Sequence, residues 1–407
     1  MKKYPKFLLA QLLLLVFLSG CTAIKAINLM NSSEVVINYV DRQIQFATEG
    51  HLILVKVKIN HSREEYTFIL DTGALTMLSK RVAEGLSLPE GIEIDASGTG
   101  GNTQAITLVK LDSVVVGGMK VKNCAAGVID FSSIFPHTID GILGSNFLQH
   151  FKVTIDFQKQ ELTLSQDPTP VHAEDNDVKI PMELDMLMGF APVVQCELDD
   201  AIQDDAIIDT GLPGYIGLPV SMIKKLPSFE NGSVVPSNGS MSFGMFGSGK
   251  NENYALRLNK VKIGSLQLQN VAATSHAHKD GKILIGYKFL EKYRVILNYP
   301  AKELLLRPTG VPFEHNIPSY GFALTKNDQK TVVSGVWVGS DAFQKGLQPG
   351  DEILAINSVA MSTVPTIGEV VQMFFSDEKQ RSLTIEFSHE NKRKSAVLHK
   401  MNLLPDL

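Results

Sequence analysis

The chain is poor in the features that define several large classes of protein. Its 407 residues include three cysteines and one tryptophan, which excludes a small scaffold held together by disulfides. There are 43 acidic and 38 basic residues and no basic stripe interleaved with aromatics, so charge gives no reason to expect nucleic-acid binding. No glycine-rich phosphate loop and no Ser/His/Asp nucleophile motif stands out. What remains is an ordinary globular composition and a length that suits two or three domains.

The amino-terminal segment differs from the rest of the chain. Three lysines within the first six residues precede an apolar stretch, residues 7–18, broken once by a glutamine. This stretch is too short for a membrane-spanning helix and has the form of a secretory signal. No later apolar run approaches membrane-spanning length. We therefore expect the mature protein to be tethered to a membrane and not embedded in one.

The sequence Leu18-Ser19-Gly20-Cys21 resembles the lipobox of bacterial lipoproteins. The resemblance implies cleavage before Cys21, with lipid on its thiol and on the new amino terminus. Residues 1–20 would then be a lipoprotein signal peptide and residues 21–31 a tether. The implied location is the bacterial cell envelope, in the periplasm or at the outer membrane, with membrane contact through the lipid anchor only. An uncleaved anchor, or an ordinary signal with an accidental cysteine, is the alternative.

A long internal repeat organises the middle of the chain. Residues 108–127 match residues 255–274 at a spacing of 147, and the segment from Asp140 matches the segment from Gly281. In each copy a buried-looking apolar run ends in Asp-Thr-Gly, at residues 71–73 and again 138 residues later. These matches occur in the same order, which indicates a duplicated domain. We expect lobe 1 at residues 32–167, a polar linker at 168–178 and lobe 2 at 179–308.

Alternating apolar residues predict that both lobes consist mainly of strands. Strands are predicted at 52–59, 153–157 and 256–263, with single helical turns after Gly144 and Gly286. The repeat aligns Cys124 with a valine, so a small buried apolar role is the preferred interpretation. A disulfide between Cys124 and Cys196 stays open, because two cysteines do not establish one.

Two carboxylates at the ends of apolar runs predict a shared site. If the two copies meet across an approximate two-fold axis, Asp71 and Asp209 lie side by side and hold one proton between them. The ionised partner takes a proton from water while the protonated one polarises a carbonyl, which supports attack on a peptide bond without a covalent intermediate. The residues that follow them have supporting roles, the threonines linking the two loops and the glycines allowing close approach: Thr72, Gly73, Thr210 and Gly211.

The doubled motif resembles the aspartic proteases. In each copy, Asp-Thr-Gly is followed about seventy residues later by two apolar residues and Gly, at 142–144 and 284–286. Residues 71–74, Asp-Thr-Gly-Ala, are similar to retroviral-type enzymes, while two lobes in one chain are similar to the pepsin arrangement. The resemblance implies a mainly β, bilobal fold of duplicated β-barrel lobes, endopeptidase activity on protein or peptide substrates, no cofactor, and a hairpin flap over the cleft. Glycine-rich stretches between the motifs are the flap candidates, although surface turns would look the same: Gly98, Gly100, Gly101, Gly244 and Gly247.

One position departs from the pepsin-like pattern. Pepsin-like enzymes usually carry Ser or Thr after Asp-Thr-Gly, and here those positions are Ala74 and Leu212. Without these hydroxyls the charged form of the dyad loses support, so we expect raised pKa values. The pair His276 and His278 has the spacing of metal ligands but no acidic or cysteine partner nearby. We expect no metal there.

The pattern changes after lobe 2. Residues 346–358, GLQPGDEILAINS, resemble the turn-and-strand signature of PDZ domains, and residues 319–324 resemble their carboxylate-binding loop, with Tyr320, Gly321 and Phe322 at its centre. The resemblance implies a small α/β PDZ domain at 315–403, with a helix at 362–376 walling a groove that binds a C-terminal or extended peptide. A docking role without peptide capture is the alternative.

The sequence therefore predicts a monomeric, lipid-anchored aspartic endopeptidase whose PDZ domain recruits or positions substrates. A catalytically inactive scaffold, which binds peptides in the cleft and chain ends at the PDZ domain, is the alternative from another functional class.

Overall fold

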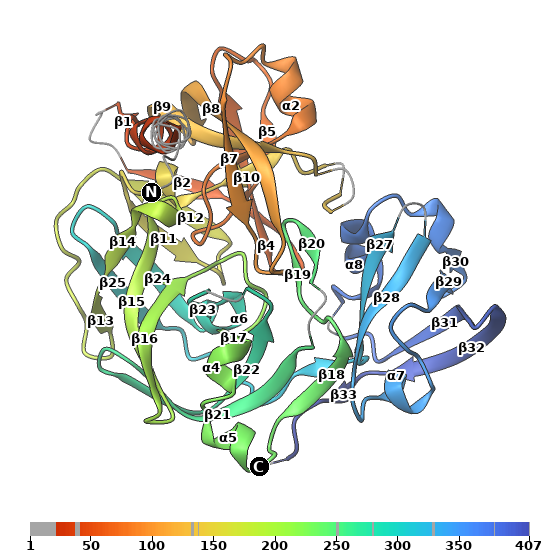
Figure 1. Cartoon of the computed structure of the whole chain (residues 1–407). Helices are drawn as coiled ribbons and strands as arrows, with labels where there is room; N and C mark the ends of the chain where they lie inside the picture. Colours follow the sequence, from red (N-terminus) through yellow and green to blue (C-terminus); the bar gives the residue numbers. More distant parts are fainter. Residues whose placement is uncertain are drawn as a thin grey trace, which may run out of the picture.

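The computed structural model describes residues 22–36, 41–131, 134–136, 138–249, 252–278, 281–327, 330–377 and 379–406. Cys21 and the predicted signal peptide lie outside the described residues. The chain forms two β lobes and a third unit, residues 315–403, which we call the C-terminal unit (Figure 1). No helix among the described residues is long and apolar enough to cross a membrane.

Lobe 1 is built on one strongly bent sheet in which buried and exposed side chains alternate. The predicted strand at Leu52–Ile59 is confirmed as β4. The strands of this sheet, in spatial order, are Glu34–Val35 (β1), Met119–Ile129 (β9), Met77–Ser79 (β6), Gly141–Leu143 (β10), Tyr66–Leu70 (β5), β4, Thr103–Val116 (β8) and Ile92–Ser97 (β7), with Ala47–Glu49 (β3) paired to β4.

Lobe 2 repeats this arrangement and continues into the C-terminal unit. Its strands, in spatial order, are Glu183–Asp185 (β14), Ala191–Leu198 (β15), Ile202–Ile208 (β16), Ile283–Ile285 (β23), Ile216–Pro219 (β17), Leu266–His276 (β22), Tyr254–Ile263 (β21) and Val235–Gly239 (β18). A short hairpin of Phe243–Gly244 (β19) and Gly247–Ser248 (β20) follows β18.

The two lobes share turn chemistry at equivalent positions. Gly117 and Gly118 join β8 to β9 with positive φ values of 56° and 89°, the backbone that a two-residue hairpin turn requires. Asn123 and Asn270, 147 residues apart, both adopt left-handed φ values, 54° and 57°. The repeat seen in the sequence is therefore also a repeat of backbone conformation.

A sheet between the lobes carries their approximate two-fold axis. Its strands, in order, are Val178–Pro181 (β13), Glu303–Pro308 (β25), Tyr293–Asn298 (β24), Lys152–Asp156 (β11), Glu161–Ser165 (β12) and Arg42–Gln45 (β2). At the centre of the antiparallel β11–β24 pair, Thr154 faces Ile296. These residues are equivalent in the repeat, so the pairing relates one lobe to the other by rotation.

Short helices cover the strand ends. The predicted single turns after Gly144 and Gly286 are confirmed as Ser145–Leu148 (α3) and Tyr287–Leu290 (α6), and the residues predicted as a tether are helical over 22–30. The remaining short helices of the lobes are Lys80–Gly85 (α2), Met186–Met188 (η1), Val220–Ile223 (α4) and Pro227–Glu230 (α5).

The C-terminal unit is a small β sheet with one amphipathic helix. Its elements are Pro318–Ser319 (β26), Phe322–Asn327 (β27), Lys330–Trp337 (β28), Asp341–Gln344 (α7), Glu352–Ile356 (β29), Val359–Ala360 (β30), Met361–Thr363 (η2), Ile367–Phe374 (α8), Ser382–His389 (β31), Lys392–His399 (β32) and Met401–Asn402 (β33). The helix predicted at 362–376 begins later, because a capping box of Thr366 and Glu369 fixes the start of α8.

The C-terminal unit is joined to lobe 2 by a continuous sheet. In β18, Val235 pairs with Ala255 of lobe 2, while Ser237 pairs with Trp337 of β28. Figure 1 shows this unit in blue beside β18, with α8 directed towards lobe 1. The amide of Gly368 in α8 donates to the carbonyl oxygen of Ile134 in lobe 1 at 2.9 Å. The unit thus contacts both lobes.

Candidate active site

The aspartate of each Asp-Thr-Gly motif lies at the end of a buried pair of parallel strands. In lobe 1, β5 runs parallel to β10, and the Asp71 amide donates to the Leu143 carbonyl at 3.1 Å. In lobe 2, β16 runs parallel to β23, and the Asp209 amide donates to the Ile285 carbonyl at 2.9 Å. An apolar run ends on a carboxylate because that residue begins the loop which faces the other lobe.

The two threonines lock these loops together. The Thr72 hydroxyl donates to the Ile208 carbonyl at 2.6 Å, and the Thr210 hydroxyl donates to the Leu70 carbonyl at 2.9 Å. Each hydroxyl also accepts the other threonine's backbone amide at 3.1 Å. Both side chains are buried. This symmetric exchange of hydrogen bonds fixes the distance between the two loops, because hydrogen bonds form only over a narrow range of donor–acceptor distances.

Each glycine of the motif lies against the carboxyl group of the opposite loop. A Cβ atom on Gly73 would lie 2.7 Å from Cγ of Asp209, and one on Gly211 would lie 2.7 Å from Cγ of Asp71. Such distances are shorter than van der Waals contact, so only glycine fits at either position. The structure therefore brings all six residues of the two predicted triplets into one site.

The dyad's environment raises both pKa values. Burial raises the pKa of Asp71 well above its ordinary value, and the neighbouring charge of Asp209 raises it further. Burial also raises the pKa of Asp209, while hydrogen bonds from the amides of Gly211 and Leu212 and from the Asp71 side chain oppose the rise. Asp209 accepts two backbone amides, whereas Asp71 accepts only that of Gly73, at 2.9 Å, so Asp209 is the better-supported anion.

Ala74 and Leu212, the two positions at which the sequence departs from the pepsin-like pattern, face apolar surroundings. Ala74 packs at the edge of an apolar cluster of lobe 1 that includes Met77 and Ile142, and Leu212 packs against Val193 and Leu284. Burial is the largest cause of the raised pKa values, so the rise comes mainly from the whole site. The additional rise expected from the two absent hydroxyls stays a prediction.

Beneath the Asp71 loop lies a hydroxyl pair that the sequence did not indicate. The Ser145 side chain donates to the Thr72 carbonyl at 2.7 Å and lies 2.8 Å from the Tyr299 hydroxyl. Tyr299 is buried, which raises the pKa of its phenol. Ser145 and Tyr299 are 154 residues apart in the sequence, so no local motif could have revealed the pair. The pair supports the Asp71 loop of lobe 1. In lobe 2, the repeat places Tyr287 at the position equivalent to Ser145.

The predicted flap glycines lie at two hairpin tips that meet. Gly98, Gly100 and Gly101 are in the turn between β7 and β8, and Gly244 and Gly247 are in the β19–β20 hairpin. Their positions at turns are confirmed. They also pack together, since a Cβ on Gly98 would lie 3.2 Å from the Phe246 ring and one on Gly244 would lie 2.9 Å from the Thr99 hydroxyl.

Residues outside the predicted set hold these tips. The Asn102 side-chain amide donates to the carbonyl oxygens of Phe246 and Ser248, both at 3.0 Å. Met245 and Phe246 pack at the edge of the lobe 1 apolar cluster that also contacts Ala74. The tip of the lobe 2 hairpin thus reaches over to the side of lobe 1 that carries the Asp71 loop.

A fully buried asparagine anchors the stem of the lobe 2 hairpin. The Asn253 side-chain oxygen accepts the amides of Met241 and Ser242 at 2.7 and 3.2 Å, and its nitrogen donates to the Ser275 carbonyl at 3.0 Å. Two residues further on, the Ala277 amide donates to the Thr99 carbonyl of the other hairpin at 3.1 Å. Asn253 therefore ties the lobe 2 hairpin to the end of β22, and Ala277 ties the lobe 1 hairpin to the residues just after it.

The histidine pair contributes to this region as structure. Burial lowers the pKa of His276 to about 4, and its Nε2 lies 3.0 Å from the Lys282 carbonyl. Among the described residues, no group of three or more histidine, cysteine or acidic side chains could hold a metal ion. Cys124 and Cys196 are both free and buried, so the possible disulfide is absent from this structure.

The predicted carboxylate-binding loop of the C-terminal unit opens β27. Gly321 has a φ of 95°, a conformation that favours glycine. Tyr320 and Phe322 are buried, and both rings contact Phe375 after α8 edge to face. β27 pairs with β28 along one edge, and α8 contacts β27.

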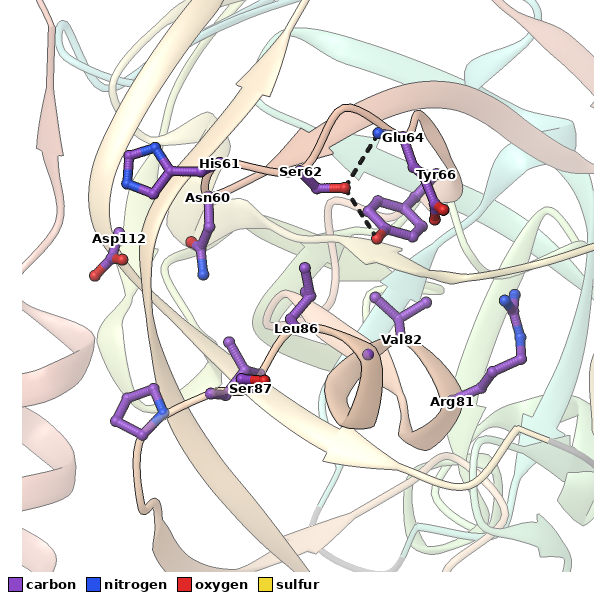
Figure 2. Close-up of a pocket in the computed structure, with 13 residues that line it drawn as sticks. Asn60, His61, Ser62, Glu64, Tyr66, Arg81, Val82, Leu86, Ser87 and Asp112 are labelled. Carbon is purple, nitrogen blue, oxygen red and sulfur yellow. Dashed lines mark hydrogen bonds between the residues drawn. The ribbon is translucent and has the colours of Figure 1, made fainter.

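A pocket of about 560 Å³ lies elsewhere on lobe 1. Figure 2 shows it between α2 and the turn before β5, where the Ser62 hydroxyl accepts the Glu64 amide and lies 3.3 Å from the Tyr66 hydroxyl. Val82 and Leu86 form an apolar side, and the charged Arg81 lies at the edge. Neither dyad aspartate lines this pocket, so it is separate from the candidate active site.

The fold and the site define a class. This is a mainly β protein whose barrel-like sheets are consistent with aspartic protease lobes. Residues 55–147, from within β4 through the Asp71 loop to α3, match the family model described as aspartyl protease. A search of curated proteins found no match. The match to this family supports protease function for the chain.

Proposed function

We propose that the chain is an aspartic endopeptidase that hydrolyses peptide bonds with the Asp71–Asp209 dyad. The observation that carries the proposal is the symmetric exchange between Thr72 and Thr210, which holds the two carboxyl-bearing loops face to face. A protein that used the fold only for binding would not need two neighbouring carboxyl groups, with Asp209 buried and Asp71 half-buried, since removing carboxyl groups from water is costly. A catalytic role accounts for this unfavourable placement of the two carboxyl groups.

The hydrogen bonds at the dyad support a division of roles, since Asp209 accepts two backbone amides and Asp71 accepts one. Asp209, as the anion, takes a proton from a water molecule, whose oxygen attacks the carbonyl carbon of the peptide bond. Asp71 gives its proton to the carbonyl oxygen, which yields a neutral tetrahedral diol. Asp209 then gives its proton to the amide nitrogen while Asp71 takes a proton from a hydroxyl of the diol. The carbon–nitrogen bond breaks, a carboxylic acid and an amine are released, and the dyad again holds one proton, on Asp71. No covalent enzyme intermediate and no cofactor is required.

The paired hairpins are the proposed flaps. Their tips meet through Asn102 and Phe246 on the side of the dyad, so substrate entry requires that these contacts open and closure excludes water from the reaction. Glycines at the tips provide close approach to a bound chain.

The C-terminal unit is the proposed PDZ domain, which binds a chain end beside β27 by strand addition. Its sheet continues through β18 into the stem of the lobe 2 hairpin: the Ser240 amide donates to the Ser334 carbonyl at 2.8 Å. A peptide captured on this unit would therefore be held at a fixed position relative to the flap.

Peptide hydrolysis tests the enzymatic proposal directly. The full-length protein in detergent should cleave an unfolded protein substrate, and a statine-type transition-state mimic such as pepstatin should inhibit cleavage in competition with substrate. Substrate binding without any cleavage, over the acidic to neutral range, would instead support the inactive scaffold.

We also propose that lipid on Cys21 anchors the protein in the bacterial envelope. The support is the lipobox-like sequence and the apolar segment before it. Cys21→Ser should abolish acyl labelling and shift the protein out of the detergent phase. Unchanged labelling in that variant would contradict the anchor.

A further inference from the structure

The helix at residues 22–30 has two apolar faces. One face packs on lobe 1, where Ala26 and Met30 are buried against Leu108. Away from this buried face, and one helical turn apart, Ile24 and Ile27 are 59% and 37% exposed. A surface helix with a single partner normally presents polar residues outward, so the outward isoleucines indicate a second apolar environment.

A loop of lobe 2 adds to this outward face. Met186, Leu187 and Met188, which form η1, are 42%, 77% and 39% exposed. The Asn31 side-chain amide links the two elements, since it donates to the Ile27 carbonyl at 2.9 Å and lies 3.4 Å from the Met186 sulfur. We call Ile24, Ile27, Met186, Leu187 and Met188 the apolar edge.

The η1 loop is held firmly in this exposed position. The Asp185 side chain caps it by accepting the amides of Leu187 and Met188 at 3.0 and 3.3 Å, and Lys282 pairs with Asp185 at 3.3 Å. Gly189 closes the loop in a left-handed conformation. A structured loop that displays three large apolar side chains is costly in water, and clusters of this kind mark interaction sites.

We propose that the apolar edge is a membrane-contact surface that inserts into the interface of the bilayer beside the lipid anchor. The inference rests on the proposed lipidation of Cys21, which is bonded directly to the first residue of the helix. At about 1.5 Å of rise per residue, Ile24 and Ile27 lie within roughly 10 Å of that anchor along the helix. Acyl chains at Cys21 would therefore hold the helix at the headgroup level, where apolar side chains gain by burial.

The position of the edge on the molecule fits a bilayer. In Figure 1 the helix near β1 and the loop after β14 lie on the side of the lobes away from the C-terminal unit. Membrane contact there leaves β27 and α8 free to face the envelope space. Lys25 is also exposed on this helix, and a cation near a membrane surface is attracted to anionic headgroups.

Site-specific fluorescence tests this surface in the full-length, lipidated protein. An environment-sensitive nitrobenzoxadiazole label is attached to Leu187→Cys, with Val397→Cys as the matched control, since Val397 is an exposed apolar residue (46%) on β32 of the C-terminal unit. The native Cys124 and Cys196 are buried and should not react. Each protein is reconstituted into vesicles of phosphatidylethanolamine and phosphatidylglycerol, with or without a shallow nitroxide-labelled lipid.

The label at 187 should be quenched by the nitroxide lipid and severalfold less accessible to iodide than the label at 397. Equal iodide access at both positions would overturn the inference. So would equal protection of the 187 label in detergent micelles and in vesicles, which would indicate cover by the chain's own amino-terminal residues or by a second copy.

The anchor and the enzyme are scored separately in the same samples, by the mass of acylated Cys21 and by cleavage of a soluble peptide. An acylated, active protein with an exposed 187 label refutes the membrane surface alone. A protein without acyl groups whose 187 label still meets lipid refutes the anchor and supports the surface. Ile27→Gln combined with Leu187→Gln should then weaken vesicle binding of the Cys21→Ser protein by about tenfold, given the apolar area lost.

Discussion

The side-chain amide of Asn102 donates to the backbone carbonyl of Phe246 at 3.0 Å, so that one residue of lobe 1 fastens the hairpin of lobe 2. The same nitrogen bonds the Ser248 carbonyl. A single asparagine thus holds both sides of the β19–β20 turn in the closed arrangement of the two hairpins.

Asn102→Ala should loosen this closed state. Two hydrogen bonds worth about 1 kcal/mol each are lost, so amide hydrogen exchange at residues 243–248 should rise by about tenfold or more. Ser97→Ala is the control, because it removes a hydroxyl pair with Thr103 on the same hairpin away from lobe 2. Equal exchange in the wild type and Asn102→Ala would show that the tips are held by packing alone.

Asp71→Asn and Asp209→Asn should each abolish peptide cleavage. One carboxyl group cannot serve as both base and acid, so we expect a loss of at least about a thousandfold in kcat. The control is Asp112→Asn, an exposed carboxylate on lobe 1 far from either loop in the sheet. Far-ultraviolet circular dichroism checks that the β fold is kept. Turnover near that of the wild type in either variant would refute the dyad.

Thr72→Ala should destabilise the pairing of the lobes. It leaves the Ile208 carbonyl and the Thr210 amide buried without their partners, at a cost of about 2–4 kcal/mol in the free energy of unfolding. Thr72→Ser keeps the hydroxyl and loses one methyl group, so it should cost only about 1 kcal/mol. Urea unfolding followed by the fluorescence of the single tryptophan measures both. Similar losses for the two variants would mean that the methyl group, not the hydroxyl, matters.

Gly321→Ala should abolish peptide capture by the C-terminal unit while sparing cleavage of short peptides. Its φ of 95° disfavours alanine, and a Cβ there would collide with the Ser340 side chain. Gly339→Ala is the matched control, since Gly339 also has a positive φ, 81°, but open space around its Cβ position. Fluorescence anisotropy with a peptide bearing a free C-terminal carboxylate, and with its amide, gives the readout. Equal affinity in Gly321→Ala and Gly339→Ala would favour a docking role without peptide capture.

The sequence predicted the structural features that depend on neighbouring residues or on the internal repeat. The apolar runs that end in Asp71 and Asp209, the strand at Leu52–Ile59 and the turns at Gly98 and Gly244 follow from patterns within a few residues. The duplication then predicted that the two loops meet.

Contacts between distant segments could not be predicted in this way. Asn253 looks like any loop asparagine until the fold surrounds it with the hairpin stem and Ser275. The pairing of β18 with β28, which merges lobe 2 with the C-terminal unit, leaves no trace in either strand's own pattern. The expected tether became a helix because its inward residues found an apolar surface on lobe 1.

The buried dyad should also leave a pH signature in stability. The pKa of Asp71 is raised above its ordinary value of 3.8, so the folded protein binds a proton that the unfolded chain releases. The contribution of Asp71 to the free energy of unfolding therefore falls as pH rises from about 4 through the folded pKa, by at most about 1.4 kcal/mol per pH unit. Asp71→Asn lacks this proton, so its stability relative to the wild type should increase over the same range.

Asp177→Asn provides a control of opposite sign. Hydrogen bonds from Arg307 hold the pKa of Asp177 below its ordinary value, so this carboxylate stabilises the fold above pH 4 and the benefit is lost as pH falls. Urea midpoints at several pH values between 3 and 7 (chosen to bracket the unperturbed carboxyl pKa) give both comparisons. A stability difference between Asp71→Asn and the wild type that does not change with pH would mean that Asp71 titrates like an ordinary surface aspartate. The assignment of Asp71 as the proton-bearing partner would then be wrong, even if both aspartates proved essential for cleavage.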